Sequence, residues 1–244
     1  MSIGTAVPSW EQLSRVKHYF IQDHSIMDDY TAGKYELEAV ALIEKLFDEG
    51  HDTLVMAGGS GFYIDAVCSG LDDFPPADPL LRAELSQRLR TEGVESLRFE
   101  LRRLDPESYA AIDIANGQRV IRALEVCLQT GRKFSSFKTG SAKKRSFEIE
   151  KVGLSRPREE LYGRIDRRVL QMVSDGLVEE ARALLPHRDR PALQTVGYRE
   201  LFDFFDGRTD LETAVSLIQR NTRHYAKRQL SWWGRDKDIR WIEL

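Results

Sequence analysis

Residues 53–67 read TLVMAGGSGFYIDAV, and this stretch decides the fold class. Residues 53–57 are uncharged and mostly apolar, as in a buried strand, and a glycine-rich run at 58–61 follows them directly. From Phe62 to Val67 the pattern becomes helical. A strand, a glycine turn and a helix in this order are typical of a parallel α/β sheet whose site lies at the carboxyl end of the strand.

The flanking sequence continues this α/β pattern on both sides. Thr31 is a good cap for a helix whose apolar residues recur at helical spacing, and Gly50 suits its end. Residues 147–154, FEIEKVGL, alternate like a strand, and long helices follow from Arg158. Residues 239–244 predict a final short strand.

The sequence changes character after Gly70. Residues 74–79, FPPADP, form a linker in which Asp78 can cap a helix that starts at Pro79. From there to about Gly131 the patterns are helical throughout, and residues 139–145 are polar and basic. We therefore predict an α/β core built from residues 1–71 and 146–244, with an all-helical insertion at 72–145.

Composition excludes several classes of protein. The chain has 244 residues, of which 41% are hydrophobic and 31% charged, so it can bury a substantial core. No apolar run reaches the roughly 18 residues of a membrane span and no signal peptide is visible, which predicts a cytoplasmic protein without a membrane partner. Cys68 and Cys127 stand apart and the five histidines form no HExxH-like pair, so no metal site made of side chains is expected.

A basic and aromatic stretch, QRNTRHYAKRQLSWW, occupies residues 219–233. On a helix its cations share an arc of about 140°, while the aromatic residues and a leucine lie outside that arc. We expect an anion-binding face whose other side is packed. The cations are Arg220, Arg223, His224, Lys227 and Arg228, and the apolar residues are Tyr225, Leu230, Trp232 and Trp233.

A second basic helix is predicted inside the insertion. Residues 116–125, NGQRVIRALE, place Arg119 and Arg122 three positions apart with Gln118 beside them, and Arg82 on the preceding helix could add to them. Such a helix is either a surface laced with salt bridges or a grip on a polyanion. The pairs at 28–29 and 72–73 are interpreted as turn and cap aspartates.

The chain contains no Walker A loop, GxxxxGK[ST]. Its ordered motifs nevertheless resemble one family, the tRNA dimethylallyltransferases, over nearly the whole chain. The matching blocks are IGTAVPS (3–9), GGSGFY (58–63), NGQRVIRALEV (116–126), REELYGRIDRRV (158–169), MVSDGLVEEA (172–181), LQTVGYREL (193–201) and TRHYAKRQLSWW (222–233).

The resemblance implies a P-loop NTPase-like parallel sheet core. Family members carry a strand, a Walker A loop, a helix and a DSRQ-type motif upstream of the IGTA block. We expect this chain to lack those first strands, the phosphate loop and the general-base aspartate, and so to be an inactive fragment. The resemblance also implies a monomeric full-length protein, although exposed apolar edges would favour association of the fragment.

The implied reaction transfers a dimethylallyl group from dimethylallyl diphosphate to N6 of the adenosine at position 37, next to the anticodon. Arg223 takes the catalytic, diphosphate-holding role by matching position, supported by Lys227 and Arg228. Mg²⁺ would be bound mainly through the diphosphate. The implied tRNA contacts, on the anticodon stem-loop, are Ser60, Arg82, Gln118, Arg119, Val120, Ile121 and Arg122.

Two alternatives remain at this point. A related prenyltransferase could act on free adenine nucleotides, although the basic insertion favours a large RNA. A noncatalytic RNA-binding module is compatible with the absent phosphate loop.

Overall fold

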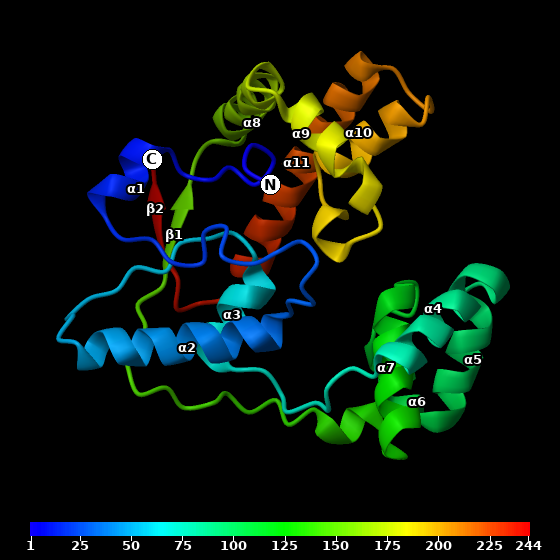
Figure 1. Ribbon diagram of the computed structural model, residues 1–244. Coiled ribbons are helices and arrows are strands. Elements are labelled where there is room, and N and C mark those ends of the chain that lie inside the picture. The colour runs from blue at the N-terminus through cyan, green and yellow to red at the C-terminus, as the bar shows by residue number, and fades with distance from the viewer. The chain divides into compact units, whose positions relative to one another are not determined.

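The computed structural model describes residues 1–244, which form two compact units (Figure 1). One unit contains residues 1–68 and 146–244, and the other contains residues 69–145. Each unit is described by itself below.

The larger unit is mostly helical with a small parallel sheet. Strand β1 (Val152–Ser155) pairs with β2 (Arg240–Glu243) in parallel, with Val152 opposite Arg240 and Ser155 opposite Glu243. Its helices are α1 (Trp10–Arg15), α2 (Ala32–Asp48), α3 (Gly61–Ser69), α8 (Arg158–Ser174), α9 (Leu177–Leu184), α10 (Tyr198–Phe205) and α11 (Leu211–Trp233), with short 3-10 turns η2 (Leu185–His187) and η3 (Pro191–Leu193). The predicted strands at 147–154 and 239–244 are therefore present, the first shorter and later than expected.

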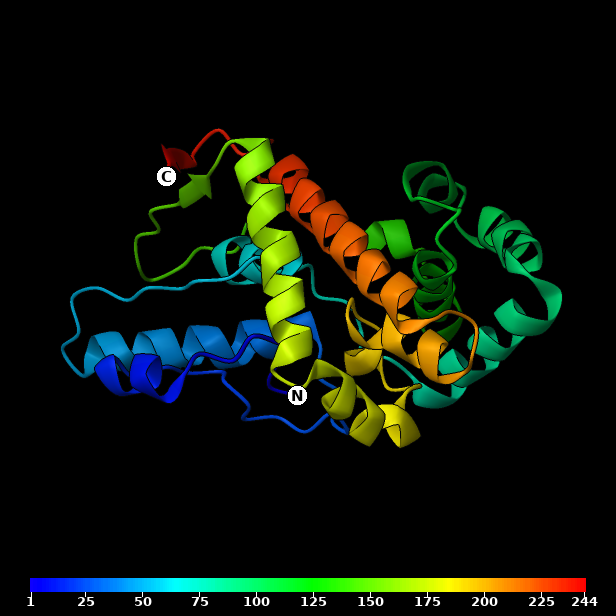
Figure 2. The ribbon, with the colours of Figure 1, turned by 90° about the horizontal axis from the view of Figure 1, so that it is seen from above.

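The core of this unit lies among α8, α9, α10 and α11. The long helices α8 and α11 pack side by side (Figure 2). Tyr198, Leu201 and Ile218 are almost completely buried at their junction with α9. This packing holds α11 rigidly along one side, so the position of its basic residues is set by the core.

One predicted strand is wrong. Residues 53–57 form no strand, and the Val55 side chain is 88% exposed. The sheet pairs β1 with β2 alone, so residues 53–57 have no neighbouring strand to accept or donate ladder hydrogen bonds, and a strand is stable only as part of such a ladder. The apolar run indicates a propensity to form a strand, but a strand forms only where a second strand can pair with it.

The smaller unit is an all-helical bundle. Its elements are α4 (Pro79–Glu92), α5 (Val94–Leu104), α6 (Pro106–Ala111), α7 (Gly117–Thr130) and the 3-10 turn η1 (Phe134–Phe137). Asp78 accepts hydrogen bonds from the Leu80 and Leu81 amides at the start of α4, as predicted from the sequence. Asn116 caps α7 in the same way, and Gly131 ends it in a left-handed conformation with φ of 67°.

Helix α7 forms the centre of this bundle. Val120, Ile121 and Leu124 are buried against Leu85 of α4 and Leu97 of α5. The buried apolar stripe fixes which face of α7 is left for polar contacts. Figure 1 shows α7 among α4, α5 and α6.

Candidate functional site

The cations of α11 gather as expected from helical spacing. Arg220, His224, Lys227 and Arg228 are exposed. Residues 219–233 contain no Asp or Glu, so no counter-ion is supplied within this part of the helix. The stripe therefore presents uncompensated positive charge along the outer face of a helix whose start, at Ala214 and Ile218, is buried in the core.

Arg223 differs from its neighbours. Its guanidinium forms an ion pair with Asp166 of α8 and lies 6.0 Å from the ring centre of Tyr162, on the same helix. Its side chain is 27% exposed. The Asp166 carbonyl also accepts a hydrogen bond from Gln219, which ties the two helices together at this point. The residue assigned to the diphosphate is thus held by an aspartate.

The glycine turn at 58–61 lies directly against the carboxyl end of α11. Gln229 donates a hydrogen bond of 2.9 Å to the Gly59 carbonyl, and Trp232 donates one of 2.8 Å to Asp65 of α3. A Cβ at Gly59 would lie 1.9 Å from the Gln229 amide nitrogen, and one at Gly61 would lie 2.6 Å from the Trp232 ring. At Gly61 a side chain would displace the Trp232 ring, whereas at Gly59 only the end of the flexible Gln229 side chain would have to shift.

The expected packed apolar side of α11 needs correction. Tyr225, Leu230 and Trp232 are 41%, 43% and 40% exposed. This end of the helix is anchored instead by polar contacts with the glycine turn, together with partial contact of the aromatic rings. Ser60 is exposed in that turn, and its carbonyl accepts from the Tyr63 and Ile64 amides in the first turn of α3.

The predicted basic grip of the insertion is mostly neutralised. Arg82 and Arg122 both donate to Oε2 of Glu125, at 2.6 and 2.7 Å, and Glu125 is completely buried. Arg122 also donates to the Pro75 carbonyl at 2.9 Å. Of the two readings open from the sequence, the salt-bridge helix describes these two arginines.

The remaining members of that group separate into exposed and buried residues. Gln118 and Arg119 are exposed at the start of α7. Val120 and Ile121 are 0% and 1% exposed, so an RNA contact through their side chains is wrong for this structure. The family resemblance assigned a contiguous run of residues to tRNA. On a helix, every third or fourth position of such a run faces the core and is buried.

A glutamate that the sequence reading missed joins three of the family blocks. The Glu180 carboxylate accepts hydrogen bonds from the amides of Ser2, Ile3 and Gly4, at 2.6 to 3.0 Å, and from the Tyr198 hydroxyl at 2.6 Å. Burial raises the pKa of Glu180, but these four donors outweigh it and bring the pKa below its ordinary value. Burial and the bond to Glu180 raise the pKa of Tyr198.

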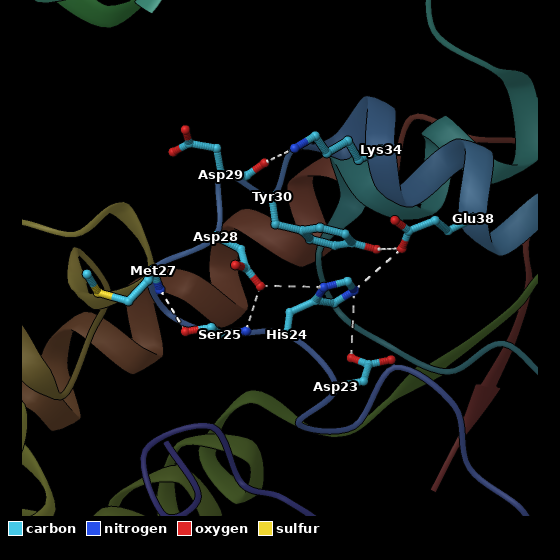
Figure 3. A network of polar contacts seen from close by, with 9 residues as sticks. All are labelled: Asp23, His24, Ser25, Met27, Asp28, Asp29, Tyr30, Lys34 and Glu38. Carbon is cyan, nitrogen blue, oxygen red and sulfur yellow. Dashed lines mark hydrogen bonds and ion pairs between the residues drawn. The ribbon is translucent and has the colours of Figure 1, made fainter.

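A polar network around His24 was also unforeseen (Figure 3). Its ring nitrogens lie 3.4 to 4.0 Å from the carboxylates of Asp23, Asp28 and Glu38, and the ring packs on Tyr30 with centres 4.0 Å apart. The turn interpretation of Asp28 agrees with the structure, because its carboxylate accepts from the Ser25 amide. Only folding brings Glu38 of α2 to this loop.

The carboxylates of the aspartates at 72–73 make long-range contacts instead of the expected local turn and cap contacts. Asp72 accepts from the amide and hydroxyl of Thr139, and Asp73 pairs with Lys143. No group of three or more His, Cys, Asp or Glu is placed to hold a metal ion. No helix meets the length and hydropathy that a membrane span requires.

Comparisons with known proteins place this geometry in a family. The family model for IPP transferase matches residues 1–236. The tRNA dimethylallyltransferase of Christiangramia forsetii is 49% identical over 244 residues, which are 100% of this chain and 80% of the relative. The tRNA dimethylallyltransferase 2 of Porphyromonas gingivalis (strain ATCC 33277) is 51% identical over 242 residues, covering 99% of this chain and 80% of the relative.

Two solved structures of related proteins are similar to this chain. The full-length tRNA isopentenylpyrophosphate transferase of Bacillus halodurans is similar to this chain with a TM-score of 0.66 and 34% identity, covering 99% of this chain and 76% of that one. A eukaryotic dimethylallyltransferase acting on tRNA is similar with a TM-score of 0.77 over 99% of this chain and 63% of that one. At 21% identity, this second likeness shows the fold alone.

Proposed function

The chain belongs to the IPP transferase family, and from that membership we propose that its reaction is the transfer of a dimethylallyl group from dimethylallyl diphosphate to N6 of the adenosine at position 37 of tRNA, with residues 1–244 supplying contacts to the diphosphate and to tRNA. The observation that carries the proposal is the row of cations on α11 beside the glycine turn. Arg223, Lys227 and Arg228 lie on the helix whose end contacts Gly59.

The chemistry explains why cations are needed there. When the prenyl carbon leaves its diphosphate, negative charge builds on the departing oxygens, and fixed positive groups lower the barrier by meeting that charge. Arg223 is preorganised by Asp166 and Tyr162, while Lys227 and Arg228 are exposed and free to reach diphosphate or RNA phosphate. Mg²⁺ bound to the diphosphate would add charge neutralisation.

The target base must also be accessible. An adenine inside the anticodon-loop stack cannot reach a buried donor, so it has to unstack first. Ser60 lies exposed in the glycine turn, where its hydroxyl can reach a base or ribose of the RNA. We assign Ser60 in the larger unit to an RNA contact and, separately, Gln118 and Arg119 in the smaller unit to RNA contacts of their own.

The test is a pair of measurements on the 244-residue chain, namely tRNA binding across a salt series and prenyl transfer from labelled donor. Salt-sensitive tRNA binding is expected. A folded chain that does not bind tRNA at low salt would overturn the proposal. Competition between AMP and tRNA decides between the RNA enzyme and a free-nucleotide enzyme.

Negligible transfer by residues 1–244 alone stays a prediction. It is based on the absence of a Walker A loop within these residues. The comparisons, which cover 99% or more of the chain, give it no support. Robust turnover would refute it and would confirm transferase activity directly.

A further inference from the structure

The insertion carries a second cationic surface that does not include the α7 arginines. No Asp or Glu occurs between Glu125 and Glu148, whereas residues 131–147 contain six Lys or Arg. Within it, residues 132–138 form a segment around η1 that we name the basic–aromatic turn. Its sequence is RKFSSFK.

Two carboxylates hold this turn in place. Asp105 is fully buried and accepts from the Ser135 amide at 2.7 Å and the Ser135 hydroxyl at 2.9 Å, besides two bonds from Ser108. Burial raises the pKa of Asp105, but these hydrogen bonds prevail and the pKa lies below its ordinary value. At the far end, Asp72 accepts two bonds from Thr139. The backbone of the turn is therefore held at its centre, at Ser135, and just beyond its end, at Thr139.

Aromatic rings hold two of its cations. The Arg132 guanidinium carbon lies 4.5 Å from the ring centre of Phe137, and the Lys138 ammonium lies 5.0 Å from that of Phe134. Phe74 stacks on Phe134, with ring centres 4.6 Å apart. Such contacts restrict the side chains before any ligand arrives, which lowers the entropy cost of binding one.

The same cations are not neutralised by a neighbouring carboxylate. Arg132, Lys133 and Lys138 are exposed, and no carboxylate forms an ion pair with them, although Lys138 contributes to the lowered pKa of Asp72 after the larger effect of the Thr139 hydrogen bond. Arg82 and Arg122 share the buried charge of Glu125 instead. The turn therefore presents positive charge without a carboxylate partner, in contrast to Arg82 and Arg122, while Arg119 is also exposed at the start of α7.

We propose that the basic–aromatic turn binds the phosphate backbone of the RNA substrate, as a contact separate from the basic face of α11. Positive groups interleaved with aromatic rings suit RNA, because phosphates pair with the cations and unstacked bases or riboses pack on rings and guanidinium planes. The inference rests on the proposed function, since it names where the tRNA is held.

The test compares two double variants in tRNA binding measured by fluorescence anisotropy. R132Q/K138Q removes the two ring-backed charges of the turn. K17Q/K45Q is the matched control, since Lys17 also lies over a ring, at 4.9 Å from that of Tyr19, and Lys45 is exposed on α2. We expect R132Q/K138Q to raise Kd about tenfold and to reduce the slope of log K against log salt by about 1.5. The control should change Kd less than about twofold.

A third variant separates charge from preorganisation. F137L keeps every charge and removes the ring under Arg132, so we expect weaker binding with an unchanged salt slope. Circular dichroism checks that each variant is folded.

The outcomes distinguish the inference from the function. Wild-type Kd and slope for R132Q/K138Q, with binding lost in K227Q/R228Q, would sink the inference and leave the function standing. An equal loss of tRNA affinity in K17Q/K45Q would also sink it, because the loss would then reflect the net charge of the chain and not the turn. Absence of tRNA binding by the folded wild-type chain would defeat the proposed function itself.

Discussion

Arg223 on α11 and Asp166 on α8 form an ion pair, so the cation assigned to the diphosphate already has an anionic partner. Asp166 orients the guanidinium, and it also competes with any other anion for it. Both side chains are partly exposed, so solvent screens the interaction.

D166N should strengthen binding of inorganic diphosphate, because a competing negative charge is removed from the guanidinium. We expect a gain of about 1 kcal/mol, or roughly fivefold in Kd, by isothermal titration calorimetry. R223Q should weaken the same binding. R220Q is the charge-matched control on the same helix, and an equal effect of R220Q and R223Q would remove the special role of Arg223.

Loss of the Glu180 charge should destabilise the larger unit. E180Q weakens three backbone contacts and the Tyr198 bond, and we expect the free energy of unfolding to fall by about 2 kcal/mol in urea titrations. Y198F removes one bond and should cost about 1 kcal/mol. E179Q, at the exposed neighbouring position, is the control. An E180Q chain as stable as E179Q would contradict the prediction.

Asp105 should make the insertion sensitive to acid. Its pKa in the folded state lies below the ordinary value of 3.8, so the folded state binds its proton less readily than the unfolded state. The stabilisation is complete above about pH 5 and is lost as the pH falls through the folded pKa. D105N should flatten the dependence of unfolding free energy on pH below about 4, whereas E107Q should retain it.

Glu125 should be essential to the fold of the insertion. E125A leaves Arg82 and Arg122 without their shared carboxylate and opens a space in the core, so we expect a loss of about 3–5 kcal/mol in unfolding free energy. R82Q should cost less, because the Arg82 side chain is 41% exposed. A cost of E125A no greater than that of R82Q would show that the shared ion pair is unimportant.

The glycine turn offers a test of close packing. G61A places a methyl group 2.6 Å from Trp232 and should displace that ring, with a lower melting temperature and altered near-ultraviolet dichroism. G58A is the matched control, because its added Cβ would meet nothing nearer than 3.7 Å. Equal melting temperatures and equal dichroism for G61A and G58A would mean that the carboxyl end of α11 shifts at little cost to make room for the methyl group.

Local signals in the sequence predicted much of the fold. Asp78 before Pro79, Thr31 before α2 and Gly131 after α7 act within one turn of the chain, so their consequences are visible without tertiary contacts. The strand prediction for residues 53–57 was wrong because a strand depends on contacts with distant parts of the chain. Its strand propensity needs a hydrogen-bonding neighbour, and propensity does not supply one.

For the site, residue types and helical spacing determined where cations gather, and ordered motifs determined the family. Only the tertiary structure decided which of these cations are paired with a carboxylate and which are not. Asp166 reaches Arg223 from 57 positions away in the chain, and Glu125 reaches Arg82 from 43 positions away. Electrostatic pairing depends on distance in space, so the sequence alone specified the charges, while folding selected those that remain available to a ligand.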